Sequence, residues 1–162
     1  MLKDKVIYTY EMNPFTMAVL SKEKSNGTFS TVVLEENEEY TVFQTPTKMI
    51  DFACKFYGSS LRGRLDGTKD VCNITYKAPI VIEPGSGMYF FPTESPQNKS
   101  CSWLAHSYIA DINPINDGSK TVIKFTNGKI VTIDISYGSM QNQLNRTAQF
   151  RYRLNERMKL DQ

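Results

Sequence analysis

The chain has 162 residues, of which 40% are hydrophobic and 22% charged, a composition that suits one globular domain with an ordinary core. No stretch approaches the roughly 18 apolar residues of a membrane span, and residues 1–10 show no apolar run behind a basic start, so neither a membrane protein nor a secreted one is expected. We expect a single domain over residues 1–162, in the cytoplasm and without a membrane partner.

Charge is distributed unevenly along the chain. The 19 lysines and arginines against 17 aspartates and glutamates leave a net charge of +2, less than the strongly basic balance of many small nucleic-acid binders. Residues 1–45 carry four lysines against seven acids, whereas residues 100–162 carry eight basic side chains against five acids. A basic surface is therefore expected from the later part of the chain.

The first half reads mainly as β-structure. Short β-branched and aromatic runs at 15–20, 29–34 and 39–43 predict strands, and the acidic segment 35–38 predicts a hairpin loop between the last two. Residues 46–57 change to helical spacing, with Thr47 as a candidate cap and Gly58 as the stop.

Further strands are expected in the second half, after a glycine-rich loop at 58–64. The sequence predicts them at 71–76, 80–82, 88–91 and 103–109, followed by a hairpin over 121–135. Asn127-Gly128 favours a type I′ turn in that hairpin. A long helix from Ser139, its N-cap, to about residue 160 closes an α+β fold of mostly antiparallel strands.

The long helix is predicted to carry a basic stripe. At 100° per residue, its core-facing arc contains Met140, Leu144, Ala148, Phe150, Leu154 and Met158. Arg146, Arg153 and Arg157 fall on one line of the outer face, whereas Arg151 points toward the core side. Guanidinium groups in such a line suit phosphates or a narrow DNA minor groove. The alternative is a solvated helix face.

A second basic feature surrounds the glycine-rich loop. Residues 58–63 have the glycine spacing of a P-loop, but Arg64 replaces the lysine and a helix precedes the segment, which argues against nucleotide hydrolysis. Exposed amides with Arg62 and Arg64, flanked by Lys55 and Lys69, would suit a nucleic-acid phosphate. The alternative is a flexible turn.

Neither a metal site nor catalysis is expected. The three cysteines Cys54, Cys72 and Cys101 lack the close pairs of structural zinc. A hydrolase using Cys101 or Cys54 with His106, the single histidine, remains an alternative, but no catalytic signature accompanies them. We therefore expect no enzyme and no cofactor.

Several segments, in order over about residues 8–157, resemble one family. They are CKFYGSS at 54–60, GR at 63–64, GT at 67–68, KAPI at 77–80, FFPT at 90–93, CSW at 101–103 with His106, ISY at 135–137, NQ at 142–143 and RTA at 146–148. Together they are similar to the ComK family of competence transcription factors from Bacillus-like bacteria. Ala78 stands where the family would have a second proline.

The resemblance implies an activator of genes for DNA uptake and recombination. Its double-stranded DNA target would be paired A/T-rich promoter boxes, read largely through the minor groove, which implies self-association into a dimer or a dimer of dimers at the nucleoid. It also implies RNA polymerase and a Clp protease adaptor as partners, although the tail that the adaptor recognises in longer members continues past the position of Gln162. The resemblance implies no contact residues, so Arg146, Arg153, Arg157, Arg62, Arg64, Lys55 and Lys69 are predicted from charge and placement.

An alternative from another class is a protein-interaction module with only nonspecific DNA affinity. In that case the acidic segment 35–39 or the basic helix would dock a protein partner. Preference for A/T-boxed over G/C-rich duplex at physiological salt separates the two.

Overall fold

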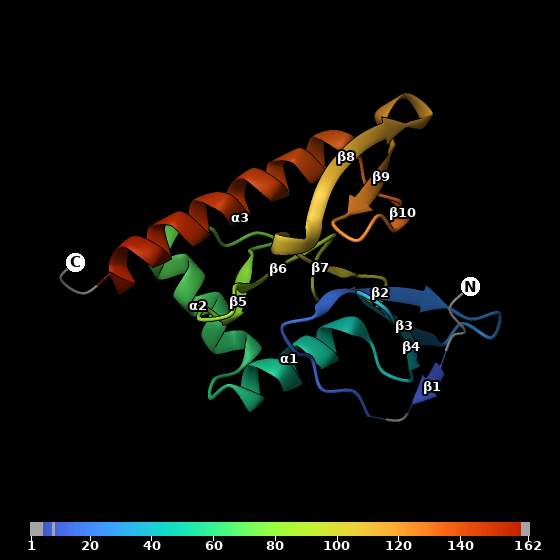
Figure 1. The fold of residues 1–162 in the computed structure, drawn as a ribbon, viewed down its shortest axis with the longest axis horizontal. Helices are drawn as coiled ribbons and strands as arrows, with labels where there is room; N and C mark the ends of the chain where they lie inside the picture. Colours follow the sequence, from blue (N-terminus) through green and yellow to red (C-terminus); the bar gives the residue numbers. More distant parts are fainter. Residues whose placement is uncertain (1–4, 8, 160–162) are drawn as a thin grey trace.

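Two β-sheets packed face to face and three α-helices make up the computed structural model, which describes residues 5–7 and 9–159 (Figure 1). A seven-stranded sheet has the strand order β1-β4-β3-β2-β7-β6-β5, and a three-stranded sheet has the order β10-β9-β8. All strand pairs are antiparallel except β1 with β4. The predicted α+β class is confirmed.

The element bounds follow the chain from end to end. The strands are β1 (Lys5–Ile7), β2 (Thr16–Glu23), β3 (Phe29–Glu35), β4 (Glu39–Val42), β5 (Ile80–Glu83), β6 (Met88–Pro92), β7 (Trp103–Ala105), β8 (Ile109–Ile115), β9 (Lys120–Phe125) and β10 (Ile130–Ile133). The helices are α1 (Pro46–Phe56), α2 (Leu61–Cys72) and α3 (Tyr137–Met158), with short 3-10 turns at His106–Tyr108 and Asn116–Gly118.

The central part of the seven-stranded sheet is buried on both faces. Because side chains alternate along a strand, Val19 and Val33 face α1, whereas Ala18 and Leu34 face the three-stranded sheet and α3. Trp103 lies fully buried on the α1 side. The central strands therefore read as nearly continuous apolar runs.

Helices α2 and α3 close the sheet at its β5 edge. Phe150 of α3 packs edge-on against Tyr89 of β6, with ring centroids 5.7 Å apart, and together with Val81 it forms a small apolar cluster that Val71 and Leu154 flank. This contact brings α2 and α3 side by side (Figure 1). The two most basic segments of the chain thus become neighbours.

Several sequence predictions needed correction. Residues 61–72 form a helix instead of a glycine-rich loop and the start of a strand, because Ser60 caps the helix and Thr68 packs inward. Two helical glycines cost about 1 kcal/mol each relative to alanine, and these contacts offset that cost. The strand predicted over 103–109 is interrupted by the 3-10 turn, so that β7 and β8 join different sheets.

Turn and helix ends differ in smaller ways. In the β9–β10 hairpin, Gly128 has a positive φ of 89° and Asn127 does not, which matches a type I turn with a left-handed glycine instead of type I′. The N-cap of the long helix is Ser136, three residues before the predicted cap Ser139, and residue 160 lies outside the described residues. Ala148 and Met158 of the predicted core arc are exposed.

Candidate nucleic-acid interface

Helix α3 is the platform for the basic side chains. The hydroxyl oxygen of Ser136 accepts a hydrogen bond from the Ser139 N–H and caps the helix, which then runs for 22 residues. Its buried side consists of Met140, Gln143, Thr147 and Phe150. We call Arg146, Arg153 and Arg157 the arginine row; it lies along the flank of α3 that faces α2, not opposite the core as the predicted arc placed it.

Arg146 ties α3 to the segment that follows α2. One guanidinium nitrogen donates to Gln143 Oε1 at 2.9 Å and the other to the carbonyl oxygen of Tyr76. Gln143 in turn donates to the carbonyl oxygen of Lys77 at 3.0 Å. Burial lowers the pKa of Arg146, but an arginine stays charged at neutral pH. Arg146 therefore both positions the loop and contributes a positive charge.

The other two members of the row differ in their engagement. Arg157 forms an ion pair with Asp70 of α2, with Nη1 and Oδ2 2.7 Å apart, and also donates to the Asp70 carbonyl oxygen. Arg153 is exposed, and no ion pair or hydrogen bond of its side chain is present within the described part of the chain. Arg153 is thus a solvated guanidinium held between two anchored ones.

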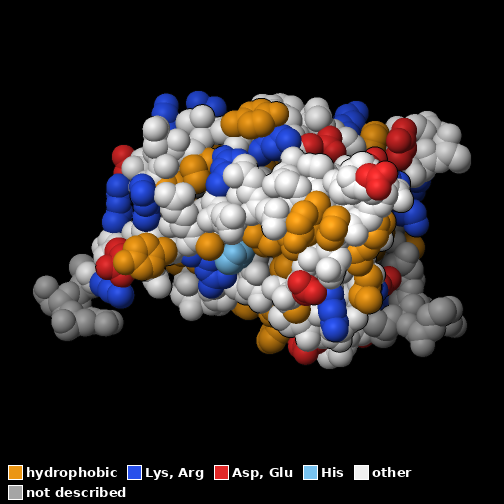
Figure 2. Space-filling model, turned by 90° about the horizontal axis from the view of Figure 1, so that it is seen from above, with side chains coloured by type: hydrophobic (Ala, Val, Ile, Leu, Met, Phe, Trp, Pro, Cys, Tyr) orange, Lys and Arg blue, Asp and Glu red, His pale blue; other side chains and the backbone are white. Residues whose placement is uncertain are grey.

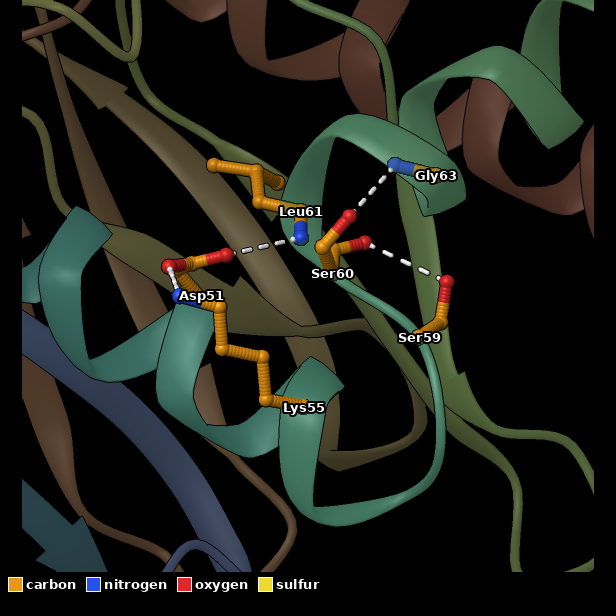
Figure 3. Close-up of polar contacts among 6 residues, drawn as sticks. All are labelled: Asp51, Lys55, Ser59, Ser60, Leu61 and Gly63. Atoms are coloured by element: carbon orange, nitrogen blue, oxygen red, sulfur yellow. Dashed lines mark hydrogen bonds and ion pairs between the residues drawn. The ribbon is translucent and has the colours of Figure 1, made fainter.

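Lys55 belongs to the corner between α1 and α2 (Figure 3). Its ammonium group lies 2.9 Å from Asp51 Oδ2, and the other carboxylate oxygen of Asp51 accepts the Leu61 N–H at 2.9 Å. Burial raises the pKa of Asp51, but the hydrogen bond from Leu61 and the charge of Lys55 outweigh it, so the pKa is lowered overall. The Gly63 N–H is taken by Ser60 Oγ at 2.9 Å.

For Leu61 and Gly63 the expectation of free backbone amides was therefore wrong. The N–H groups of Leu61 and Gly63 that begin α2 are occupied by Asp51 and Ser60 (Figure 3). The first N–H groups of a helix have no partner within the helix and are often capped by side chains. Neither of these two N–H groups is left for a phosphate. The basic side chains of α2 are not affected by these two hydrogen bonds.

Those side chains have different environments. Arg62 is largely exposed and lies 3.6 Å from Asp66 one turn on, and Lys69 is exposed in the last turn. Arg64 instead turns inward, where Nη2 donates to the Ile82 carbonyl oxygen at 3.1 Å and Nε is buried without a hydrogen-bond partner. Arg62 and Lys69 thus face solvent, whereas Arg64 joins α2 to β5.

The cations are concentrated over one part of the surface. Figure 2 shows Lys and Arg side chains over the half of the molecule in which α3 runs to its C-terminal end, and hydrophobic side chains around the three-stranded sheet. Sequence reasoning missed Tyr76 and Lys77 here, because residues 71–76 were predicted to be a strand. The backbone is left-handed at Asn73 and Lys77, with φ of 58° and 49°, and this places Tyr76 and Lys77 outside any strand. A left-handed conformation at a lysine is uncommon, and the sequence does not predict it.

The other candidate groups are structural. Arg151 packs over the Tyr89 ring and donates to His106 Nδ1 at 3.1 Å, which confirms that it points away from the row. Burial raises the pKa of Cys54 to about 12 and of Cys101 to about 11, so both are protonated at neutral pH and poor nucleophiles. Within the described residues, no three His, Cys, Asp or Glu side chains gather as a metal site.

The acidic segment is largely occupied by internal contacts. The carboxylates of Glu35, Glu38 and Glu39 bind Tyr10, Lys5 and Lys129 respectively. These contacts fix the segment against neighbouring strands. It therefore offers fewer unengaged charges to a protein partner than its sequence suggests.

Comparisons with known proteins bear on the same chain. A family model described as ComK protein matches residues 7–159. The chain is 34% identical over 155 residues to the competence transcription factor of Bacillus subtilis (strain 168), an alignment that covers 96% of this chain and 80% of that protein. No solved structure gives a significant match. Among the described helices, none has the length and apolar character needed to cross a bilayer.

Proposed function

The chain belongs to the ComK protein family, and we propose that it is a DNA-binding transcriptional regulator of competence that activates genes for DNA uptake and recombination. The named relative is a competence transcription factor. The observation that carries the DNA-binding part is the arginine row, in which exposed Arg153 lies between two arginines that contacts to residues 76 and 70 hold in place.

The row suits the backbone of a duplex. Arg146 and Arg157 are eleven residues apart, which corresponds to about 16 Å along a helix, so the three guanidinium groups can follow several successive phosphates. Arg62 and Lys69 add charge from the neighbouring helix. Arg64 turns inward to the Ile82 carbonyl oxygen and Lys55 lies in the corner between α1 and α2, where it pairs with Asp51, and we assign both a supporting role behind the interface.

We further propose that the DNA preferred by this surface is A/T-rich. A-tracts narrow the minor groove and concentrate its negative potential, which attracts an inserted arginine. Arg153 is the candidate for insertion because no internal partner has to be released. Paired A/T boxes would be spanned by paired copies of the chain at the nucleoid, where RNA polymerase and a Clp protease adaptor are the further partners we propose.

The test is fluorescence anisotropy of two duplexes of equal length, one with two A-tract boxes and one G/C-rich, over a salt series. Arg153→Gln should weaken binding to the A-tract duplex and lower the salt slope by about one unit, as expected when one cation is removed from the DNA interface. Lys124→Gln, which removes an exposed lysine of the three-stranded sheet, is the matched control.

Two results would contradict the proposal. If the affinities for both duplexes fell equally as the salt concentration rises, binding would be nonspecific attraction to a basic surface, which would favour the protein-interaction alternative. If Arg153→Gln bound the A-tract duplex as tightly as the parent while Lys124→Gln bound it more weakly, the interface would lie elsewhere.

A further inference from the structure

A large groove opens on the other side of α2. Its volume is about 1260 Å³, above the roughly 300–1,000 Å³ of ordinary small-molecule pockets. The walls are α1, α2, Phe29 of β3, the segments that follow β4 and α2, and the segment between β6 and β7. A site of this size suits a short extended chain better than a single small molecule.

The groove is lined by five cations and two carboxylates. The cations come from four different segments and are Lys48, Arg62, Lys69, Lys77 and Lys99. Both carboxylates are already engaged, since Asp51 binds Lys55 and the Leu61 N–H, and Asp66 pairs with Arg62. Cations spread along the walls, instead of converging on one point, complement a linear polyanion.

Aromatic rings accompany these cations. Tyr76 is 69% exposed and Phe43 is 48% exposed, and both line the groove. Lys77 lies 5.3 Å from the Tyr76 ring centroid. The Tyr76 backbone is fixed by Arg146 from α3, so its ring is presented from an anchored segment. Exposed rings beside cations are the arrangement on which unpaired bases stack.

From these observations we propose that the groove binds single-stranded DNA, with phosphates on Lys77 and Lys99 and a base stacked on Tyr76. Arg62 and Lys69, which add charge to the duplex surface, also line the groove, so the two activities are distinguished by residues that belong to one surface only: Tyr76, Lys77 and Lys99 for the groove and Arg153 for the row. The row and the groove share the segment that Arg146 holds, so both surfaces lie on neighbouring faces of α2.

The experiment measures anisotropy of fluorescein-labelled dT12 and of the A-tract duplex with the same set of variants of the full chain. Tyr76→Ala should weaken dT12 binding roughly 5- to 150-fold, the range expected for one stacked base, whereas Tyr76→Phe should retain most of it. The double variant Lys77→Gln/Lys99→Gln should lower the dT12 salt slope by about 1.4 units. Circular dichroism and thermal unfolding verify that each variant folds.

Arg153→Gln and Lys120→Gln are the matched controls, because neither side chain lines the groove. The proposal predicts that Arg153→Gln affects the duplex far more than dT12, and that Tyr76→Ala does the reverse. Unchanged dT12 affinity in Tyr76→Ala and in the double lysine variant would overturn it. So would binding of a polyglutamate peptide without binding of dT12, which would make the groove a site for acidic peptides.

Discussion

Arg146 donates a hydrogen bond to the backbone carbonyl oxygen of Tyr76, a residue 70 positions earlier in the chain. This contact joins the long helix to the segment between α2 and β5, and so connects the arginine row to the basic groove. Gln143 supports it by donating to the next carbonyl oxygen, that of Lys77. Two surfaces from distant parts of the sequence are thus held in a defined relationship.

Replacing Arg146 with glutamine should therefore loosen the segment 73–77. We expect a loss of about 1 kcal/mol in the free energy of unfolding, because the shortened side chain leaves the Tyr76 carbonyl without its charged donor. Amide hydrogen exchange should accelerate in this segment. Arg153→Gln is the control, and its free energy of unfolding should change by less than about 0.5 kcal/mol. Equal stability of the two variants would show that the Arg146 contact does not hold the segment.

Thr47 should stabilise the fold by accepting the hydrogen bond of the buried Trp103 indole. The Trp103 Nε1–H donates to Thr47 Oγ1 at 3.0 Å, and Trp103 is fully buried. Thr47→Val keeps the shape but removes the acceptor, so we expect a cost of about 1–3 kcal/mol for the buried donor left unsatisfied. The emission of Trp103, the single tryptophan, reports the change, and urea unfolding measures it. Thr47→Ser retains a hydroxyl and should recover most of the stability; a valine variant as stable as the parent would contradict this role.

Ser60 should stabilise the start of α2. Its hydroxyl oxygen accepts the Gly63 N–H at 2.9 Å, whereas the neighbouring Ser59 makes only a 3.5 Å contact to a carbonyl oxygen (Figure 3). Ser60→Ala should cost about 0.5–2 kcal/mol, as measured by thermal unfolding, and Ser59→Ala should cost less. The opposite order would show that the cap lies elsewhere.

Stability should fall between neutral and mildly acidic pH because of His106. Burial, and then the charge of Arg151, lower the pKa of His106 from its ordinary value of 6.5. The unfolded chain therefore takes up a proton at this residue at a higher pH than the folded one does. Its contribution is fully present well above pH 6.5 and is lost as the pH falls below that value toward the lowered pKa.

Urea unfolding at pH 7.5 and pH 5.5 measures this effect. The free energy of unfolding of the parent should decrease over this interval, and His106→Gln, which has no titratable group at the site, should show a smaller decrease. Carboxylates titrate mostly below this range, so they do not mask the difference. An identical decrease in both proteins would assign the pH dependence to other groups.

Local patterns determined much of the fold. The short β-branched and aromatic runs at β2, β3 and β6, each bounded by turn residues, specify strands, and the uninterrupted polar and apolar spacing of 139–158 specifies α3. The same spacing placed Arg146, Arg153 and Arg157 on one line. These features depend on interactions between residues a few positions apart, and such interactions can be read from the sequence.

Only tertiary structure decided what those residues face. Helix α2 forms despite its two glycines because capping and packing against β5 outweigh their low helix propensity, and its position turns Arg64 inward while the arginine row comes to lie beside Asp70 and Tyr76. The groove exists because α1, α2 and the segments that follow β4, α2 and β6 meet there. Such contacts join residues far apart in the chain, and their energies depend on burial and geometry that no local pattern encodes.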